Sequence, residues 1–329
     1  MHRKGLIRSL ALLYAISAGG LGVWAAAGYL GTLGTAFAQV KGATNDPSTV
    51  AASPSLAPYP TVKRGDVPQI PAMQFALYSP QSGRVIAHSA SMDPVPIAST
   101  TKLMTSHLVS KFGNLDDITV VSEAAASVNG SLAHLQAGEE ITVRNLLYCL
   151  LLVSGNDAAH ALAEYAGGVL LADPKATPEA RLNRFVQAMN DEASRLRMDK
   201  THYLDPAGLD DEGHSNAIDL AKVASLDIAD KNLQPIMDTA DNTVSDQSGT
   251  IVHVLHNSDR LVSDYQYQGS LGGKTGFTPA AGHCLMSSAM RDGHTLIAVV
   301  LNTDSSAADA SALAAKKLLD WGFSGVTWQ

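Results

Sequence analysis

The sequence predicts a mixed α/β protein of the α+β kind, in which an antiparallel sheet is assembled from both ends of the chain and encloses a helical insertion. Two observations support this fold class. Strand-like apolar runs separated by turn residues occur near residue 75 and again after residue 270, whereas helical periodicity and helix-capping residues dominate the middle. Strands from both ends of a chain bury their apolar faces most simply in one sheet covered by the intervening helices.

The N-terminal part of the predicted sheet is a hairpin. Residues 73–78 are strand-like, 79–83 contain turn residues and 84–88 form a return strand. Pro96 then leads into a helix that is expected to begin at Ala98 or Ser99.

Helices are expected through the middle of the chain. Thr142 is a candidate N-cap for a helix through the apolar run 146–153, which stops at Ser154. A second helix is expected over 158–166, and Thr177-Pro178-Glu179 is typical of the start of another. Residues 199–214 are predicted to form a loop and 219–229 a further helix.

The end of the chain returns to strands. Residues 271–278 resemble a strand at a sheet edge, and apolar runs at 283–290 and 294–301 flank a short turn, which predicts a hairpin. The last helix is expected from about Ser306 to Trp321, with Gly322 ending it.

Composition limits the kind of protein. A chain of 329 residues with 46% hydrophobic and 16% charged residues is globular and long enough for one two-lobed domain or two domains. A net charge of −8 without a basic cluster in the body argues against a nucleic-acid partner. The histidines show no metal-ligand spacing, so neither a metal nor a cofactor is expected. Cys149 and Cys284 lie in apolar runs and are expected to be buried free thiols, with a disulfide between them as the alternative in an exported protein.

The N-terminus resembles an export signal. Basic residues at positions 2–4 and 8 precede an apolar run from Ser9 to about Leu33, and Ala36-Phe37-Ala38 follows. This order predicts a secretory signal peptide over 1–38. The run is also long enough to span a bilayer, so an uncleaved anchor, and with it membrane association, remains the alternative. Either reading predicts export to the periplasm or the extracytoplasmic cell surface.

The domain boundaries follow from composition. Residues 39–66 are rich in Ala, Ser, Pro and Thr without a period, which predicts a flexible linker. The folded domain is expected over 67–329. Its sheet lobe would comprise about 67–115 and 245–329, and its helical lobe about 116–244.

Ser99 and Lys102 are the first candidate catalytic pair. They lie three residues apart and therefore share one face of a helix. A serine hydroxyl becomes a strong nucleophile when a base takes its proton, and a lysine is such a base when burial or a second cation keeps it neutral. A serine at a helix start also lies beside backbone N–H groups that stabilise an oxyanion. Taken alone, this pair also fits a capped helix with a surface lysine.

Three short motifs together narrow the function. Ser99-x-x-Lys102 at a helix start, Ser154-Gly155-Asn156 between helices and Lys274-Thr275-Gly276 on a late strand occur in this order. Over about residues 70–323 the chain resembles the D-alanyl-D-alanine carboxypeptidases among the low-molecular-mass penicillin-binding proteins. The resemblance implies the penicillin-binding-protein and β-lactamase-like transpeptidase fold, a role in peptidoglycan biosynthesis and cell shape, peptidoglycan stem peptides as substrate and β-lactams as covalent inhibitors.

Each motif residue then has an expected role. Ser99 would attack the carbonyl of a D-Ala-D-Ala peptide bond, Lys102 would take its proton, and Ser154 would relay a proton to the leaving amine. Lys274 would help to keep Lys102 neutral and would dock the terminal carboxylate of the substrate. Asn156 would hold Lys102 or the substrate amide.

The remaining motif residues are expected to bind substrate. Thr275 would add a hydroxyl to the carboxylate site, and Gly276 would let the substrate backbone approach the strand. The backbone N–H of Ser99 and, by resemblance, that of Phe277 would form the oxyanion hole. Water would then cleave the acyl-enzyme.

Three alternatives stay open. A D,D-endopeptidase that cuts cross-links would share all three motifs. The chain ends at Gln329 directly after the closing helix, so the C-terminal β domain of the longer carboxypeptidases is not expected, and the segment 280–285 also resembles short endopeptidases. A class A β-lactamase is disfavoured because Glu179, the candidate deacylating glutamate, opens a capped helix. A non-catalytic penicillin-binding sensor is disfavoured because every polar residue of the core is present.

Overall fold

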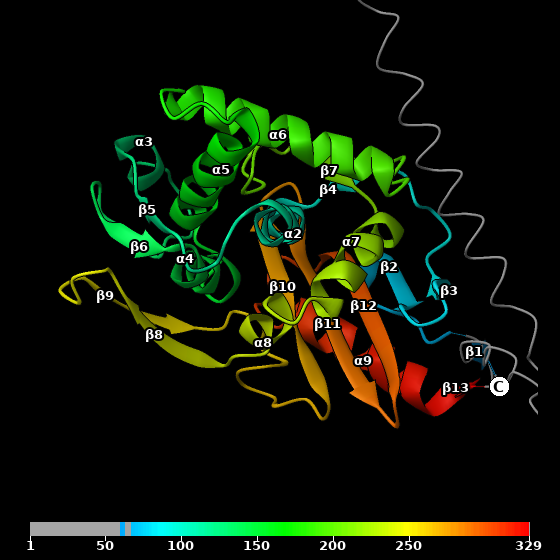
Figure 1. Ribbon diagram of the computed structural model, residues 1–329. Helices are drawn as coiled ribbons and strands as arrows, with labels where there is room; N and C mark the ends of the chain where they lie inside the picture. Colours follow the sequence, from blue (N-terminus) through cyan, green and yellow to red (C-terminus); the bar gives the residue numbers. More distant parts are fainter. Residues whose placement is uncertain (1–59, 63–66, 329) are drawn as a thin grey trace, which may run out of the picture. The chain divides into compact units, whose positions relative to one another are not determined.

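The computed structural model describes residues 60–62 and 67–328 of the chain (Figure 1). The signal peptide expected over 1–38, and most of the linker expected over 39–66, lie outside the described residues. Within the described ranges, none of the helices combines the length and the apolar character needed to cross a membrane.

A five-stranded antiparallel sheet forms the centre of the fold, with the strand order β10-β11-β12-β2-β3. Its strands are β2 (Ala72–Ser79), β3 (Arg84–His88), β10 (Ser270–Thr278), β11 (Gly282–Arg291) and β12 (His294–Thr303). The C-terminal hairpin joins the N-terminal one where β12 pairs with β2, with Val299 opposite Ala76. The predicted assembly of one sheet from both chain ends is confirmed.

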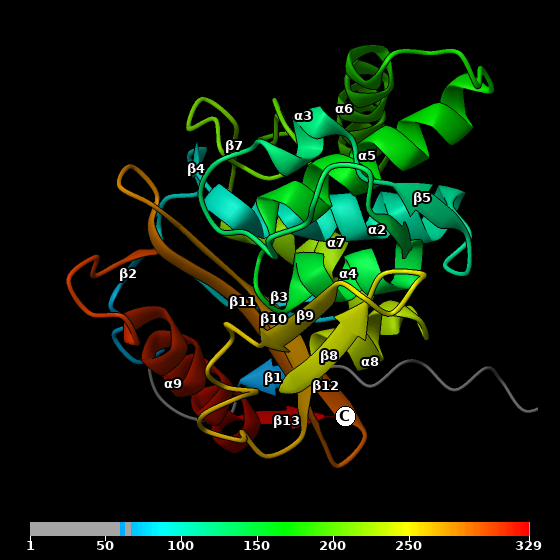
Figure 2. The ribbon, with the colours of Figure 1, turned by 90° about the vertical axis from the view of Figure 1, so that its left-hand side faces the viewer.

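Both faces of the sheet are buried. Along β12, Leu296, Ala298 and Val300 join the apolar cluster of α9 (Ala310–Gly325), while the alternate residues join the cluster on the other face. Figure 2 shows α9 on one side of the sheet and α2 (Lys102–Phe112) and α7 (Ala217–Ala229) on the other. Two-sided burial explains why the sequence of β12 is an almost continuous apolar run.

The last helix corrects one prediction. It begins at Ala310 and continues through Gly322 to Gly325, so Gly322 does not end it. A Cβ at Gly322 would lie 2.7 Å from side-chain atoms of Leu77 and Leu296. The glycine therefore serves close packing of α9 on the sheet, a role that a sequence pattern cannot distinguish from a helix stop.

The chain between the two parts of the sheet is mainly helical. Its helices are α3 (Glu123–Ala126), α4 (Val143–Leu151), α5 (Asn156–Leu171), α6 (Pro178–Arg195), α7 and α8 (Leu233–Met237). Both predicted N-caps are confirmed: Thr142 Oγ1 accepts from the N–H of Asn145, and Thr177 Oγ1 accepts from the N–H of Ala180, each at 3.2 Å. Helix α5 is longer than predicted at both ends.

Short two-stranded sheets supplement the helices. They pair β4 (Val95–Pro96) with β7 (His214–Ser215), β5 (Ile118–Val120) with β6 (Glu140–Thr142), and β8 (Asp241–Ser245) with β9 (Val252–His256). Strand β8 therefore runs across the lobe boundary expected at 244. Strands of two to five residues are too short for a two-residue period to stand out in the sequence.

The two ends of the described chain also pair. Strand β1 (Pro60–Val62), inside the segment predicted as linker, is antiparallel to β13 (Val326–Trp328). The side-chain oxygens of Thr61 and Thr327 are 2.9 Å apart. Strand β1 therefore lies ahead of the domain boundary expected at residue 67. Elsewhere in the fold, Cys149 and Cys284 are buried and unpaired, as expected.

Candidate active site

The predicted nucleophile lies in a tight turn that opens α2. The 3-10 helix η1 (Ala98–Thr101) runs directly into α2, so Ser99 occupies the first helical turn. Ala98 has a φ of 47°, a left-handed conformation that is uncommon for a residue with a Cβ. Such strain persists only where the surroundings enforce it, and it often marks functional sites.

Lys102 is fully buried and is held by three oxygen atoms. Its Nζ lies 2.8 Å from Ser99 Oγ, 2.7 Å from Asn156 Oδ1 and 2.8 Å from the carbonyl oxygen of Ala207. The last two oxygens can only accept hydrogen bonds. A neutral amine therefore donates its two hydrogens to them and turns its lone pair toward the Ser99 hydroxyl. The arrangement suits proton transfer from Ser99 to Lys102.

Burial and a second lysine set the protonation of Lys102. Desolvation holds the pKa of Lys102 well below its ordinary value, and the positive charge of Lys274 lowers this pKa further. The carboxylates of Asp205 and Asp157 act in the opposite direction but do not outweigh burial. The neutral amine is the form that a general base requires.

Lys274 on β10 is also buried. Only 1% of its surface is exposed, and its Nζ donates to Ser154 Oγ and to the carbonyl oxygen of Thr275, each at 2.9 Å. Burial lowers the pKa of Lys274 to about 7, although the carboxylate of Asp259 opposes this shift. Lys274 thus lies beneath the pocket surface, bound to the second predicted catalytic serine.

The orientation of Asn156 follows from its neighbours. Its Nδ2 donates to the carbonyl oxygen of Asn129 at 2.6 Å, which turns Oδ1 toward Lys102. Its backbone N–H donates to the carbonyl oxygen of Ser131 at 2.7 Å. The loop that carries Asn129 and Ser131 therefore fixes the side chain that holds the lysine.

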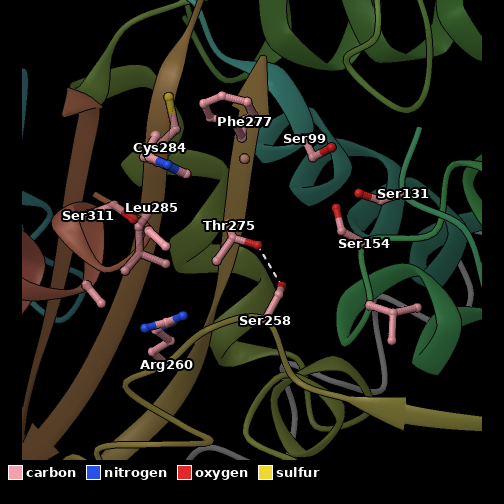
Figure 3. A pocket seen from close by; sticks show the side chains of 15 residues that line it. Ser99, Ser131, Ser154, Ser258, Arg260, Thr275, Phe277, Cys284, Leu285 and Ser311 are labelled. Carbon is pink, nitrogen blue, oxygen red and sulfur yellow. Dashed lines mark hydrogen bonds between the residues drawn. The ribbon is translucent and has the colours of Figure 1, made fainter. Parts of the chain in front are cut away.

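A pocket opens beside these groups (Figure 3). Of the predicted site residues, Ser99, Ser154, Thr275, Gly276 and Phe277 line it. Lys102, Asn156 and Lys274 are buried behind its wall. Further residues that the sequence did not single out complete the lining: Ser131, Val153, Ser258, Arg260, His283, Cys284, Leu285, Ala308, Ser311 and Ala312.

Gly276 has a packing role that was not predicted. A Cβ there would lie 3.0 Å from the backbone nitrogens of Ser99 and Thr100 and 3.1 Å from the carbonyl oxygen of Ile97. The expected reason for this glycine was access for the substrate backbone. In the structure, the missing side chain lets β10 approach the backbone of the nucleophile turn itself.

Asp205 is a positioning residue that sequence reasoning missed. Its carboxylate accepts from the backbone N–H groups of the next turn, at 2.6 to 3.2 Å, from Ala207, Gly208, Leu209 and Asp210. This turn aims the carbonyl of Ala207 at Lys102. Aspartate before Pro206-Ala207-Gly208 is typical of a side chain that closes a turn, and this signal was available.

A second set of buried polar groups holds the loop 131–139. Asp157 accepts from the backbone N–H groups of Ala133 and Leu135 at 3.0 Å each. His253 Nδ1 donates to the carbonyl oxygen of Ala133 at 2.9 Å, because a carbonyl can only accept, and its Nε2 lies 2.8 Å from Glu139 Oε1. No local pattern predicts these contacts, since the partners are far apart in the sequence.

Comparisons with known proteins identify the family of this chain. The family model for D-alanyl-D-alanine carboxypeptidase, peptidase family S11, matches residues 61–305. The chain is 31% identical over 259 residues to D-alanyl-D-alanine carboxypeptidase DacF of Bacillus subtilis, covering 77% of this chain and 62% of that protein. It is 34% identical over 237 residues to a D-alanyl-D-alanine carboxypeptidase of Streptomyces sp. K15, covering 68% of this chain and 78% of that protein.

Two further similarities bear on the reaction. A D-alanyl-D-alanine endopeptidase of Pseudomonas aeruginosa is 32% identical over 215 residues, which cover 64% of this chain and 65% of that protein. The crystal structure of the Streptomyces K15 DD-transpeptidase is similar with a TM-score of 0.71 at 30% identity, covering 79% of this chain and 100% of that chain.

Proposed function

Since the chain belongs to the D-alanyl-D-alanine carboxypeptidase family, we propose that it removes the terminal D-alanine from peptidoglycan stem peptides through an acyl-enzyme on Ser99. The observation that carries this proposal is the 2.8 Å contact between Lys102 Nζ and Ser99 Oγ, in a buried site that favours the neutral amine. β-Lactams acylate the same serine as covalent inhibitors.

Acylation begins when Ser99 Oγ attacks the carbonyl carbon of the D-Ala-D-Ala bond and its proton passes to Lys102. Negative charge then develops on the carbonyl oxygen. The backbone N–H groups of Ser99 and Phe277 stabilise that charge, and the loss of one such donor typically slows a reaction by about 10²–10³. The close approach of β10 to the nucleophile turn at Gly276 supports this pairing of donors.

Ser154 carries the proton onward to the leaving amine. Its hydroxyl lines the pocket and accepts a hydrogen bond from Lys274. The hydroxyl can therefore donate its own proton to the amine and take up the proton that Lys102 received from Ser99, which returns Lys102 to its neutral form. Water then attacks the ester, with Lys102 as general base for a second time, and Ser99 is released.

Digestion of purified muropeptides tests the proposal. We expect the full chain to release free D-alanine from pentapeptides and to leave cross-linked dimers intact. Ser99→Ala should abolish the release while the melting temperature stays unchanged. Conversion of dimers to monomers would instead support an endopeptidase. Benzylpenicillin turnover at many molecules per second would identify a β-lactamase, and acylation without any peptide hydrolysis would identify a sensor.

The cellular location is part of the same proposal. A substrate in the cell wall requires an exported enzyme, and the basic and apolar N-terminus of the sequence is typical of export. We place the protein in the periplasm or at the extracytoplasmic surface, with the N-terminal segment either cleaved or retained as an anchor. N-terminal sequencing of the mature protein from the producing cells distinguishes these two forms.

A further inference from the structure

A buried pair beside the loop 131–139 carries a proton that the mechanism above does not use. His253 on β9 and Glu139 are only 5% and 3% exposed, and His253 Nε2 lies 2.8 Å from Glu139 Oε1. His253 Nδ1 donates to the carbonyl oxygen of Ala133, so that nitrogen bears one proton. The contact between Nε2 and Oε1 then requires a second proton, which the two side chains share.

The shared proton lets the pair hold the loop from two sides. His253 holds the carbonyl of Ala133, and Glu139 Oε2 accepts from the backbone N–H of Gln136 at 2.9 Å. If the proton is lost, Nε2 presents a lone pair to a carboxylate that can only accept. Inside the fold such an unpaired polar contact is costly, so the two side chains must separate and the loop loses its support.

The loop is strained, and it fixes groups of the candidate active site. Between the two residues whose N–H groups donate to Asp157, His134 has a φ of 63°, a left-handed conformation that the surroundings must enforce. Ser131 lines the pocket, and its carbonyl oxygen accepts from the backbone N–H of Asn156. Asn156 in turn accepts from the amine of Lys102. A series of short contacts therefore connects the pair to the proposed general base.

We propose that His253 and Glu139 are positioning residues for the acylation of Ser99, and that the proton they share keeps the loop 131–139 in its active position. This assignment rests on the proposed function. Neither residue of the pair lines the pocket, so the pair acts through Asn156 and not by contact with the reacting groups. Because the proton leaves as pH rises, acylation should fall toward alkaline pH.

Other titratable groups face the pair from the elements packed around it. Burial, and then the charges of Asp157 and Glu139, hold the pKa of the Cys149 thiol on α4 above its ordinary value, so this thiol stays neutral. Asp157 on α5 contacts the same loop, and Glu140 and Asp246 line one hollow together with Glu139. These carboxylates add negative potential, which favours retention of the shared proton.

Glu139→Gln tests the shared proton with little change of shape. The amide of the glutamine places an N–H where Oε1 stood, which donates permanently to a neutral His253, and its oxygen still accepts from Gln136. The rate of fluorescent-penicillin acylation of the full chain is measured from pH 6 to 10. We expect the wild type to lose about tenfold or more of its rate toward the alkaline end. Glu139→Gln should match the wild type at neutral pH and keep its rate at pH 10.

Two further variants accompany this measurement. Asp241→Asn is the matched control, because Asp241 Oδ1 also lies 2.7 Å from a histidine of β9, His256, but these side chains are 74% and 62% exposed. It should follow the wild type at every pH. His253→Gln should already be slow at neutral pH, near the rate that the wild type reaches at the alkaline end, because one amide nitrogen cannot donate on both sides of the ring position.

Hydrogen exchange reports the loop without chemistry at Ser99. Mass spectrometry of peptides that cover 131–139 should show that protection of the backbone amides falls toward alkaline pH in the wild type and is retained in Glu139→Gln. Parallel profiles of these two proteins, in the acylation rate or in the protection, overturn the assignment of the pair while the proposed function stands. A Glu139→Gln variant as slow as His253→Gln at neutral pH overturns it as well. A wild type that releases no D-alanine and is not acylated by benzylpenicillin at any pH overturns the proposed function, and this assignment with it.

Discussion

The roles proposed for Ser99 and Lys102 depend on neighbouring groups. Burial and the charge of Lys274 lower the pKa of Lys102, which favours its neutral form. Asn156 and Ala207 accept hydrogens of the amine, and in the proposed mechanism this turns its lone pair toward Ser99. Asp205 in turn holds the Ala207 carbonyl. At the scale of single residues, the chemistry thus rests on the second lysine and on the two acceptors as much as on the serine.

The pH dependence of acylation tests the role of Lys274. In the proposed mechanism the base is neutral Lys102, so acylation should be lost as pH falls through the lowered pKa of Lys102. Lys274→Gln removes a positive charge that lowers this pKa. The acidic limb of the curve of acylation rate against pH should therefore move to higher pH. Lys274→Arg keeps the charge and should leave the limb close to its original position. The measurement is the rate of fluorescent-penicillin acylation from pH 5 to 10, and identical limbs in the wild type and Lys274→Gln would contradict the role.

At the scale of elements, substitutions at two glycines allow the effect of packing on catalysis to be measured separately from its effect on stability. Gly276→Ala places a methyl group against the backbone of the nucleophile turn, where no neighbouring side chain can move aside. Strand β10 and η1 must then separate, which displaces the oxyanion donors. We expect acylation by penicillin to slow by at least about tenfold. An unchanged acylation rate would show that the contact between β10 and η1 does not position the site.

Gly322→Ala should lower the stability of the fold and leave the acylation rate unchanged. The added methyl group would meet Leu77 and Leu296 between α9 and the sheet, away from the serine. Overpacking of this kind typically costs about 1–3 kcal/mol of the free energy of unfolding. Chemical denaturation should show that loss, while the acylation rate of the folded enzyme stays at the wild-type value. A stabilised variant would indicate that Gly322 has no packing role in α9.

The loop 131–139 is the third element whose position matters for the site. Asp157→Ala removes the acceptor for the N–H groups of Ala133 and Leu135, and each buried donor left without a partner costs about 1–3 kcal/mol. The same loop holds the backbone of Asn156 through the carbonyl oxygen of Ser131, and the preceding Asn129 holds its side chain. We therefore expect lower stability together with slower acylation. Normal acylation in a destabilised variant would show that the loop does not act through Asn156.

At the scale of the whole molecule, the described chain is closed by the pairing of β1 with β13. Three residue pairs join these strands, and cross-strand pairs contribute about 0.2–1 kcal/mol each. A chain that begins at residue 67 should therefore melt a few degrees below one that begins at residue 56. Penicillin acylation should be the same in both, because none of the residues of β1 or β13 lines the pocket described here. Equal melting temperatures by calorimetry would contradict a stabilising role for this pairing.

The sequence by itself determined the parts of this protein that local chemistry specifies. Capping threonines, turn residues between apolar runs and the spacing of Ser99 and Lys102 act over a few residues, so their pattern can be read directly. The three motifs also identified the family, and the hairpins indicated one sheet from both chain ends. Only the tertiary structure decided which distant groups meet: it buried Lys274 and brought Arg260 to the pocket, joined His253 to Glu139 and made Gly322 a packing residue. Such contacts leave no local signal, because the partners are joined by packing across the fold and not by spacing along the chain.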